Sequence, residues 1–189
     1  MTEFRKIAII GLGLIASSIC LSLRQKDPAI QIVGYDKDKE VRKRAKKIGL
    51  CEIESNIEKA VNDCKLIILC VPVGQMHPVI QKLKNFIKPG TIITDVGSVK
   101  LSVIKELEAH TENAKGKFVP SHPIAGTEKS GPDAGYAGLF EGRWCILTPT
   151  KKTNKKALKS VEIFWKFLGM QTKIMTPEHH DLVLAVTSH

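Results

Sequence analysis

The residues best suited to chemistry stand in one short segment, residues 121–131. Its eleven positions contain His122, Glu128, a lysine and several small polar residues. No helical or strand periodicity runs through the segment, so packing does not account for its composition. Histidine titrates near neutral pH and can take the proton of an alcohol while hydride leaves the neighbouring carbon. Because His122 follows an apolar run at residues 117–120, we predict that it lies at a sheet edge and acts as this base.

A second segment, near the N-terminus, is suited to holding a dinucleotide. An apolar run at residues 6–10 leads into a G-x-G-x-x-A motif, and a helical pattern follows at residues 13–25. The first glycine allows a tight turn, the second lets the backbone approach a pyrophosphate, and the small last residue lets the helix pack closely on the strand. Unpaired amides at the start of the helix favour phosphate groups. We predict cofactor contacts from Gly11, Leu12, Gly13, Leu14 and Ile15.

Asp36 strengthens this motif. It ends the next apolar run, residues 31–35, and stands about 20 residues beyond the glycines, where a dinucleotide site places its acid. A carboxylate at this position accepts hydrogen bonds from ribose hydroxyls and repels a 2′-phosphate. The sequence therefore favours NAD, and NADP stays an alternative because Lys37 and Lys39 follow closely.

Two further apolar runs end in turns that a ligand could reach. Residues 66–71 end at Val71 and Pro72, and residues 91–96 end in a turn that contains Ser98 and Lys100. Ligands of parallel sheets bind at the carboxyl ends of the strands. We predict cofactor contacts from Val71, Pro72 and Ser98, with Ser98 at the nicotinamide end. Lys100 is a candidate there too, and a surface charge is its equal alternative.

The order of apolar and helical patterns predicts the fold. Near-continuous apolar runs alternate with helical patterns from end to end, which is typical of a parallel sheet covered on both faces. We predict an α/β, Rossmann-type, doubly wound and mainly parallel sheet. The strand candidates are residues 6–10, 31–35, 66–71, 91–95, 117–120, 144–148 and 172–175, and the helix candidates are residues 13–25, 39–47, 75–87, 99–110 and 154–168.

The last segment differs from the rest. Pro177 and the acids behind it predict the start of a helix, and residues 182–186 continue it with apolar side chains nearly all round. An exposed helix of this kind needs a cover. We expect residues 1–176 to form the nucleotide-binding domain with the His122 segment, and residues 177–189 to begin a helical domain that the 189 residues do not contain.

Composition narrows the class of protein. The hydrophobic content of 43% is ordinary for a globular chain, and no apolar run approaches the roughly 20 residues of a membrane span. The five cysteines show no CxxC spacing, so we expect no metal site. The net charge of +10 raises nucleic acid as a partner, but the lysines cluster on presumed outer helix faces with few aromatics among them. We expect a cytoplasmic protein that binds neither nucleic acid nor membrane.

Together the motifs resemble a known family. Residues 11–15, 95–100 and 122–131 are similar to segments of the prephenate/arogenate dehydrogenases of tyrosine biosynthesis, as are residues 139–142 and 178–181. The resemblance spans essentially the whole chain, and the His122 segment is its most specific part.

The resemblance implies a reaction and roles for individual residues. His122 would take the ring hydroxyl proton of prephenate or arogenate while hydride passes to NAD; carbon dioxide then leaves and the ring becomes aromatic, giving 4-hydroxyphenylpyruvate or tyrosine. Ser98 would bridge this histidine and the nicotinamide. The family forms a homodimer through a helical domain, absent here, that completes the substrate site. The substrate residues implied within this chain are Gly126, Thr127, Glu128, Ser130 and His189.

Other functions stay open at this point. Hydroxyacid and imine dehydrogenases of similar two-domain build share the glycine motif, but they usually use a lysine on a late helix in place of a histidine segment. A non-catalytic NAD-binding module is a further alternative. Replacing His122 separates these classes, because only the first would lose turnover while keeping NAD binding.

Overall fold

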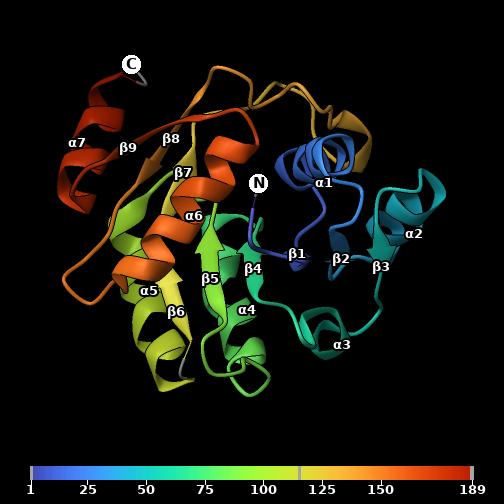
Figure 1. Ribbon diagram of the computed structural model, residues 1–189, viewed down its shortest axis with the longest axis horizontal. Coiled ribbons are helices and arrows are strands. Elements are labelled where there is room, and N and C mark those ends of the chain that lie inside the picture. Colours follow the sequence, from blue (N-terminus) through green and yellow to red (C-terminus); the bar gives the residue numbers. More distant parts are fainter. Residues whose placement is uncertain (1, 115, 188–189) are drawn as a thin grey trace.

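The computed structural model describes residues 2–114 and 116–187, and in these ranges six parallel strands form one sheet (Figure 1). The strand order is β3-β2-β1-β4-β5-β6. The chain thus winds outward from β1 in one direction and then from β4 in the other, which leaves a crevice at the carboxyl ends of β1 and β4. This confirms the predicted Rossmann-type fold. The strands are β1 Lys6–Ile10, β2 Gln31–Tyr35, β3 Glu52–Ile53, β4 Leu66–Leu69, β5 Ile92–Asp95 and β6 Lys117–Val119.

Helices cover both faces of this sheet. Neighbouring residues of a strand point to opposite faces, so one strand can contribute side chains to two cores. Ile7 and Ile9 of β1 pack in one apolar core with α1 and α6, while Ala8 and Ile10 pack in a second core with α3, α4 and α5. Apolar side chains on both faces explain the near-continuous apolar strands of the sequence. The helices are α1 Leu14–Lys26, α2 Lys39–Lys47, α3 Ile57–Val61, α4 Val73–Leu83, α5 Lys100–Asn113 and α6 Lys155–Phe167.

A second, smaller sheet, which the sequence pattern did not separate from the first, contains the last three strands of the described chain. Within the described ranges it has the order β7-β8-β9, with β7 Ser121–Pro123, β8 Trp144–Leu147 and β9 Gln171–Ile174. β7 runs antiparallel to β8, and His122 pairs with Ile146 in this register. Pro120 has no N–H to continue β6, so the chain leaves the large sheet there and begins β7. Residues 121–123 are therefore strand, and three residues are too few to show a periodicity.

The predicted helix at the end of the chain is present as α7, Pro177–Thr187. It lies against α5 (Figure 1). Its apolar side chains Leu182, Val183 and Val186 are exposed. No helix in the described part of the chain combines the length and the apolar content that a membrane crossing requires.

Candidate functional site

The glycine motif forms the turn at the β1 and β4 crevice. Gly11 follows β1 with a φ of +92°, and a Cβ there would lie 2.7 Å from the carbonyl oxygen of Cys70. Only glycine fits a left-handed backbone so close to a neighbouring strand. Gly13 differs, because no described heavy atom beyond its chain neighbours lies within 4 Å of where its Cβ would be. The space in front of Gly13 is therefore open.

The helix that follows this turn begins without a side-chain cap. The N-cap residue of α1 is Gly13, the first turn has no acidic residue, and no described side chain accepts from its first amides. In contrast, α2, α3 and α6 are capped by Asp38, Asn56 and Asn154. Uncapped amides and the positive end of the helix dipole form a site for an anion.

Asp36 lies beside this turn, at the end of β2. Its Oδ2 accepts a hydrogen bond of 2.9 Å from the backbone N–H of Leu12, and its Oδ1 accepts one of 2.9 Å from that of Asp38. These two amides fix the carboxylate at the rim of the crevice. The structure therefore brings Asp36 next to the glycine turn, as the sequence predicts.

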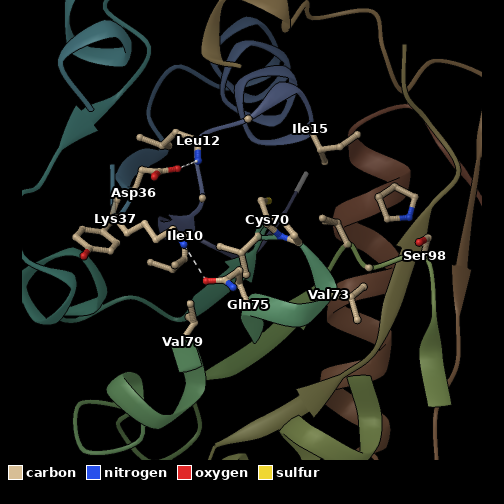
Figure 2. A pocket seen from close by; sticks show the side chains of 18 of the residues that line it. Ile10, Leu12, Ile15, Asp36, Lys37, Cys70, Val73, Gln75, Val79 and Ser98 are labelled. Atoms are coloured by element: carbon tan, nitrogen blue, oxygen red, sulfur yellow. Dashed lines mark hydrogen bonds between the residues drawn. The ribbon is translucent and has the colours of Figure 1, made fainter. Parts of the chain in front are cut away.

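A cavity of about 540 Å³ joins these elements (Figure 2). It runs from Asp36 and Lys37 past the glycine turn and β4 to Ser98 and β7. Its lining includes nine of the predicted site residues, namely Gly11, Leu12, Gly13, Ile15, Asp36, Val71, Pro72, Ser98 and His122. One elongated cavity thus contacts the glycine turn at one end and the candidate base at the other.

His122 stands at this second end, half-buried in β7. Its Nδ1 lies 2.9 Å from Nε2 of His180, on α7. Burial, and after it the positive charge of Lys100 and the neighbouring His180, lowers the pKa of His122 from 6.5 to about 3. The imidazole is therefore neutral at physiological pH and able to accept a proton.

Two residues of α7 continue this contact. His180 is buried, and its Nδ1 lies 2.7 Å from Oδ1 of Asp181. The two carboxylate oxygens of Asp181 accept hydrogen bonds from the backbone amides of Lys100 (2.8 Å) and Leu101 (3.0 Å). Asp181 thus caps the first turn of α5 from a helix some 80 residues later in the chain, and it connects that turn to His122.

Lys100 does not line the cavity, which corrects its candidacy for the nicotinamide end. Its side chain is fully buried, with Nζ paired with a carboxylate oxygen of Asp95 and 2.8 Å from the carbonyl oxygen of Ser121. Asp95 also accepts from the backbone N–H groups of Gly97 and Ser121. This buried pair ties β5 and α5 to the start of β7, and so it supports the strand that carries His122.

Several predicted site residues lie outside the cavity lining. Leu14 is half-buried against the core at the start of α1. The predicted substrate residues Gly126, Thr127, Glu128 and Ser130 are exposed on the loop that leaves β7. His189 lies outside the described residues. The roles of these residues stay predictions.

The cavity lining also includes residues of α4 that sequence reasoning missed, among them Gln75 and Val79. Lys37 donates a hydrogen bond of 2.9 Å to Oε1 of Gln75, which links the loop after β2 to α4 across the cavity (Figure 2). Val79 lines the cavity one turn further along α4. Gln75 and Val79 are four residues apart on one helix face, and this spacing alone is a weak sequence signal of a ligand site. For His180 no local signal exists, because its partner His122 stands 58 positions earlier in the chain.

The strand order, the glycine turn and the acid after β2 define a Rossmann-type nucleotide-binding domain. Comparison with known proteins narrows this class. A family model described as prephenate dehydrogenase, nucleotide-binding domain, matches residues 19–174. The chain belongs to this family.

Individual relatives are similar over nearly the whole chain. Cyclohexadienyl dehydrogenase from Zymomonas mobilis is 44% identical over 190 residues, which cover 100% of this chain and 64% of the relative. The crystal structure of prephenate dehydrogenase from A. aeolicus, in complex with hydroxyphenyl propionate and NAD+, matches with a TM-score of 0.89 and 37% identity, over 98% of this chain and 64% of that chain. Synechocystis arogenate dehydrogenase gives a TM-score of 0.87 and 30% identity, over 97% and 64%. The chain thus spans about two thirds of the length of these relatives.

Proposed function

We propose that this protein acts in the NAD-dependent oxidative decarboxylation of prephenate or arogenate. The observation that carries the proposal is the single cavity that contacts both the glycine turn with Asp36 and the candidate base His122. The hydride acceptor must reach a substrate carbon while the proton acceptor reaches the hydroxyl oxygen on that carbon, and this cavity is continuous between the two groups. The family membership supports the same reaction class.

The residues around the glycine turn fit a dinucleotide. The open space at Gly13 and the uncapped amides of α1 would receive the pyrophosphate, and Asp36 would accept hydrogen bonds from a ribose. The charge of Asp36 disfavours a 2′-phosphate, so we propose NAD as the preferred cofactor. When bound, NAD supplies the hydride acceptor.

His122 would start the chemistry by taking the hydroxyl proton of the substrate ring. Loss of that proton from the oxygen, and of a hydride from the carbon that bears this oxygen, turns the alcohol into a ketone. The carbon opposite then releases its carboxylate as carbon dioxide, and the bonding electrons move through the ring to the ketone oxygen. His122 can return its proton to this oxygen, which completes an aromatic phenol. A histidine that is neutral at physiological pH has an unprotonated nitrogen for the first of these proton transfers.

We further propose that a helical domain completes the substrate site and forms a homodimer. The exposed Leu182 and Val186 of α7 support this proposal, since apolar side chains of this size are usually covered. Ser98 would connect His122 to the nicotinamide, and Glu128 would stand at the substrate entrance. We also expect the protein to act in the cytoplasm.

The test is the reduction of NAD+ in the presence of prephenate or arogenate, followed by absorbance together with carbon dioxide release. With the helical domain present, we expect one carbon dioxide per reduced nicotinamide, and a loss of about 10²-fold to 10⁴-fold in turnover for His122→Asn with NAD+ binding retained. The 189 residues by themselves should bind NAD+ and turn over little or no substrate. His110→Asn is the matched control, because His110 lies on α5 in contact with His77 and Gln81. Turnover that survives in His122→Asn would contradict the proposed role of this residue.

A further inference from the structure

Three side chains form a line from α7 to the cavity. Asp181 Oδ1 lies 2.7 Å from His180 Nδ1, and His180 Nε2 lies 2.9 Å from His122 Nδ1. Of these residues, His180 is 1% exposed, whereas His122 lines the cavity. His180 is therefore enclosed between its two partners: its Nδ1 contacts Asp181 and its Nε2 contacts His122.

The end of the line at Asp181 fixes where the protons lie. Burial by itself would raise the pKa of Asp181, but hydrogen bonds from the amides of Leu101 and Lys100 and from His180 hold it below its usual value. An ionised carboxylate can only accept, so Nδ1 of His180 must donate. A neutral His180 then has its lone pair on Nε2, and this atom must accept a hydrogen bond from Nδ1–H of His122.

The charges around the line disfavour the other arrangement. If His180 carried both protons, Nδ1 of His122 would have to accept, and the His122 proton would move to Nε2. The ammonium group of Lys100 is buried nearby and acts on His122 as a positive charge, so a further cation between His122 and Asp181 is opposed. Asp181 attracts such a cation, but its two oxygens already accept two backbone amides.

We propose that His180 is a positioning residue that, through Asp181, holds His122 in its Nδ1–H tautomer and leaves Nε2 as the unprotonated nitrogen for the cavity. The inference rests on the proposed function, because it concerns the atom that would take the substrate proton. It assigns a role in the site to α7, which packs against α5. A base with its proton on the wrong nitrogen cannot accept the hydroxyl proton.

Of the residues that position His122, His180 is the better one to substitute in a test. Asp181 also caps α5, so replacing it would disturb the fold and the site together. His180→Leu removes the acceptor for Nδ1–H of His122 and keeps an apolar side chain in a buried position. His180→Gln keeps an acceptor oxygen that can reach the same proton. The two variants thus differ mainly in whether they can accept the hydrogen bond from His122, and less in side-chain volume.

The direct test is the tautomer of His122, read from long-range 1H–15N spectra of the 15N-labelled protein near pH 7, with His122→Asn used to assign its signals. We expect the proton on Nδ1 in the wild type and in His180→Gln, and a shift to Nε2–H in His180→Leu. In turnover assays of the active enzyme, His180→Leu should lower kcat about 10²-fold or more with little change in NAD+ affinity, and His180→Gln should restore most of it.

The outcomes separate this inference from the proposed function. An Nε2–H signal for His122 in the wild type would overturn the inference, even if His180→Leu failed to fold. An unchanged tautomer and kcat in a folded His180→Leu variant would overturn it as well. If the spectra agree with the expected tautomers but prephenate and arogenate are not turned over, the positioning role stands and the proposed reaction fails.

Discussion

The backbone N–H of Leu12 donates a hydrogen bond of 2.9 Å to Oδ2 of Asp36, which joins the glycine turn after β1 to the acid after β2. The two predicted halves of the cofactor site are therefore one connected unit. Because the amide of Asp38 holds the other carboxylate oxygen, the acid is fixed before a ligand arrives. Fixing a group in its binding geometry in advance lowers the cost of binding.

Asp36→Ala should weaken NAD+ binding and reduce the preference of the protein for NAD+ over NADP+. Losing a charge-assisted hydrogen bond costs about 1.5–3 kcal/mol, or roughly 10-fold to 100-fold in the dissociation constant. NADP+ should lose less or gain, because the repulsion of its 2′-phosphate disappears. Calorimetric titration of both dinucleotides measures the change. Asp38→Asn is the control, since it removes the same charge two residues away; an equal loss in that variant would contradict a specific contact at Asp36.

The two glycines of the turn should respond to alanine in opposite ways. Gly11→Ala forces a Cβ to within 2.7 Å of a backbone oxygen at a φ of +92°, so we expect a clear fall in the melting temperature. Gly13→Ala places its methyl group in open space and should keep the melting temperature within a few degrees. It should nevertheless weaken NAD+ binding by at least 10-fold, as it enters the space proposed for the pyrophosphate. Unchanged NAD+ binding in Gly13→Ala would count against that placement.

Lys100→Met should destabilise the fold strongly. Removing one partner of a buried ion pair leaves the other charge uncompensated, at a cost of about 3–5 kcal/mol. Asp95 would keep its backbone N–H donors but lose the only cation paired with it among the described residues. Denaturant unfolding measures the difference, with the exposed Lys105→Met on the same helix as control. A loss no larger than that of the control would show that the pair contributes little.

The lowered pKa of His122 predicts a pH-dependent stability. Between pH 6.5 and about pH 3 the unfolded chain binds a proton at this residue and the folded chain does not. Stability therefore falls as the pH drops through this window, by about 1.4 kcal/mol per pH unit, and does not depend on this group above pH 6.5.

His122→Gln should remove this dependence. Denaturant unfolding of both proteins at pH 7, 6 and 5 should show that the free energy of unfolding of the variant rises relative to that of the wild type as the pH falls. A difference that stays constant over this range would mean that His122 titrates near its ordinary pKa in the folded protein.

The sequence predicted the elements better than their arrangement. The bounds of β1, β2 and α2 agree with the predicted ranges, because long apolar or charged patterns specify them locally. β3 and β7 were missed, since strands of two and three residues have no measurable period. The second sheet was missed too, because nothing in the sequence of β8 and β9 says which strands they pair with.

In the candidate site, too, single residues were predictable from the sequence, whereas contacts between distant residues were not. The glycine turn, Asp36 and His122 carry chemistry in their residue types, which made them predictable, and all of them line one cavity of the structure. Lys100 looks like a surface lysine in the sequence, and only the fold reveals its burial against Asp95. His180 reaches His122 through the packing of α7, which no local pattern encodes.

The most direct measurement for the central claim is a calorimetric titration of NAD+ and NADP+ into the 189-residue chain, repeated for NAD+ in the presence of prephenate. We expect NAD+ to bind more tightly than NADP+, with binding weakened in Asp36→Ala and Gly13→Ala. Additional heat with prephenate would indicate that part of the substrate site lies in this chain. No binding of NAD+ by a chain that unfolds cooperatively would contradict the account of Gly13, Asp36 and the cavity between them and His122.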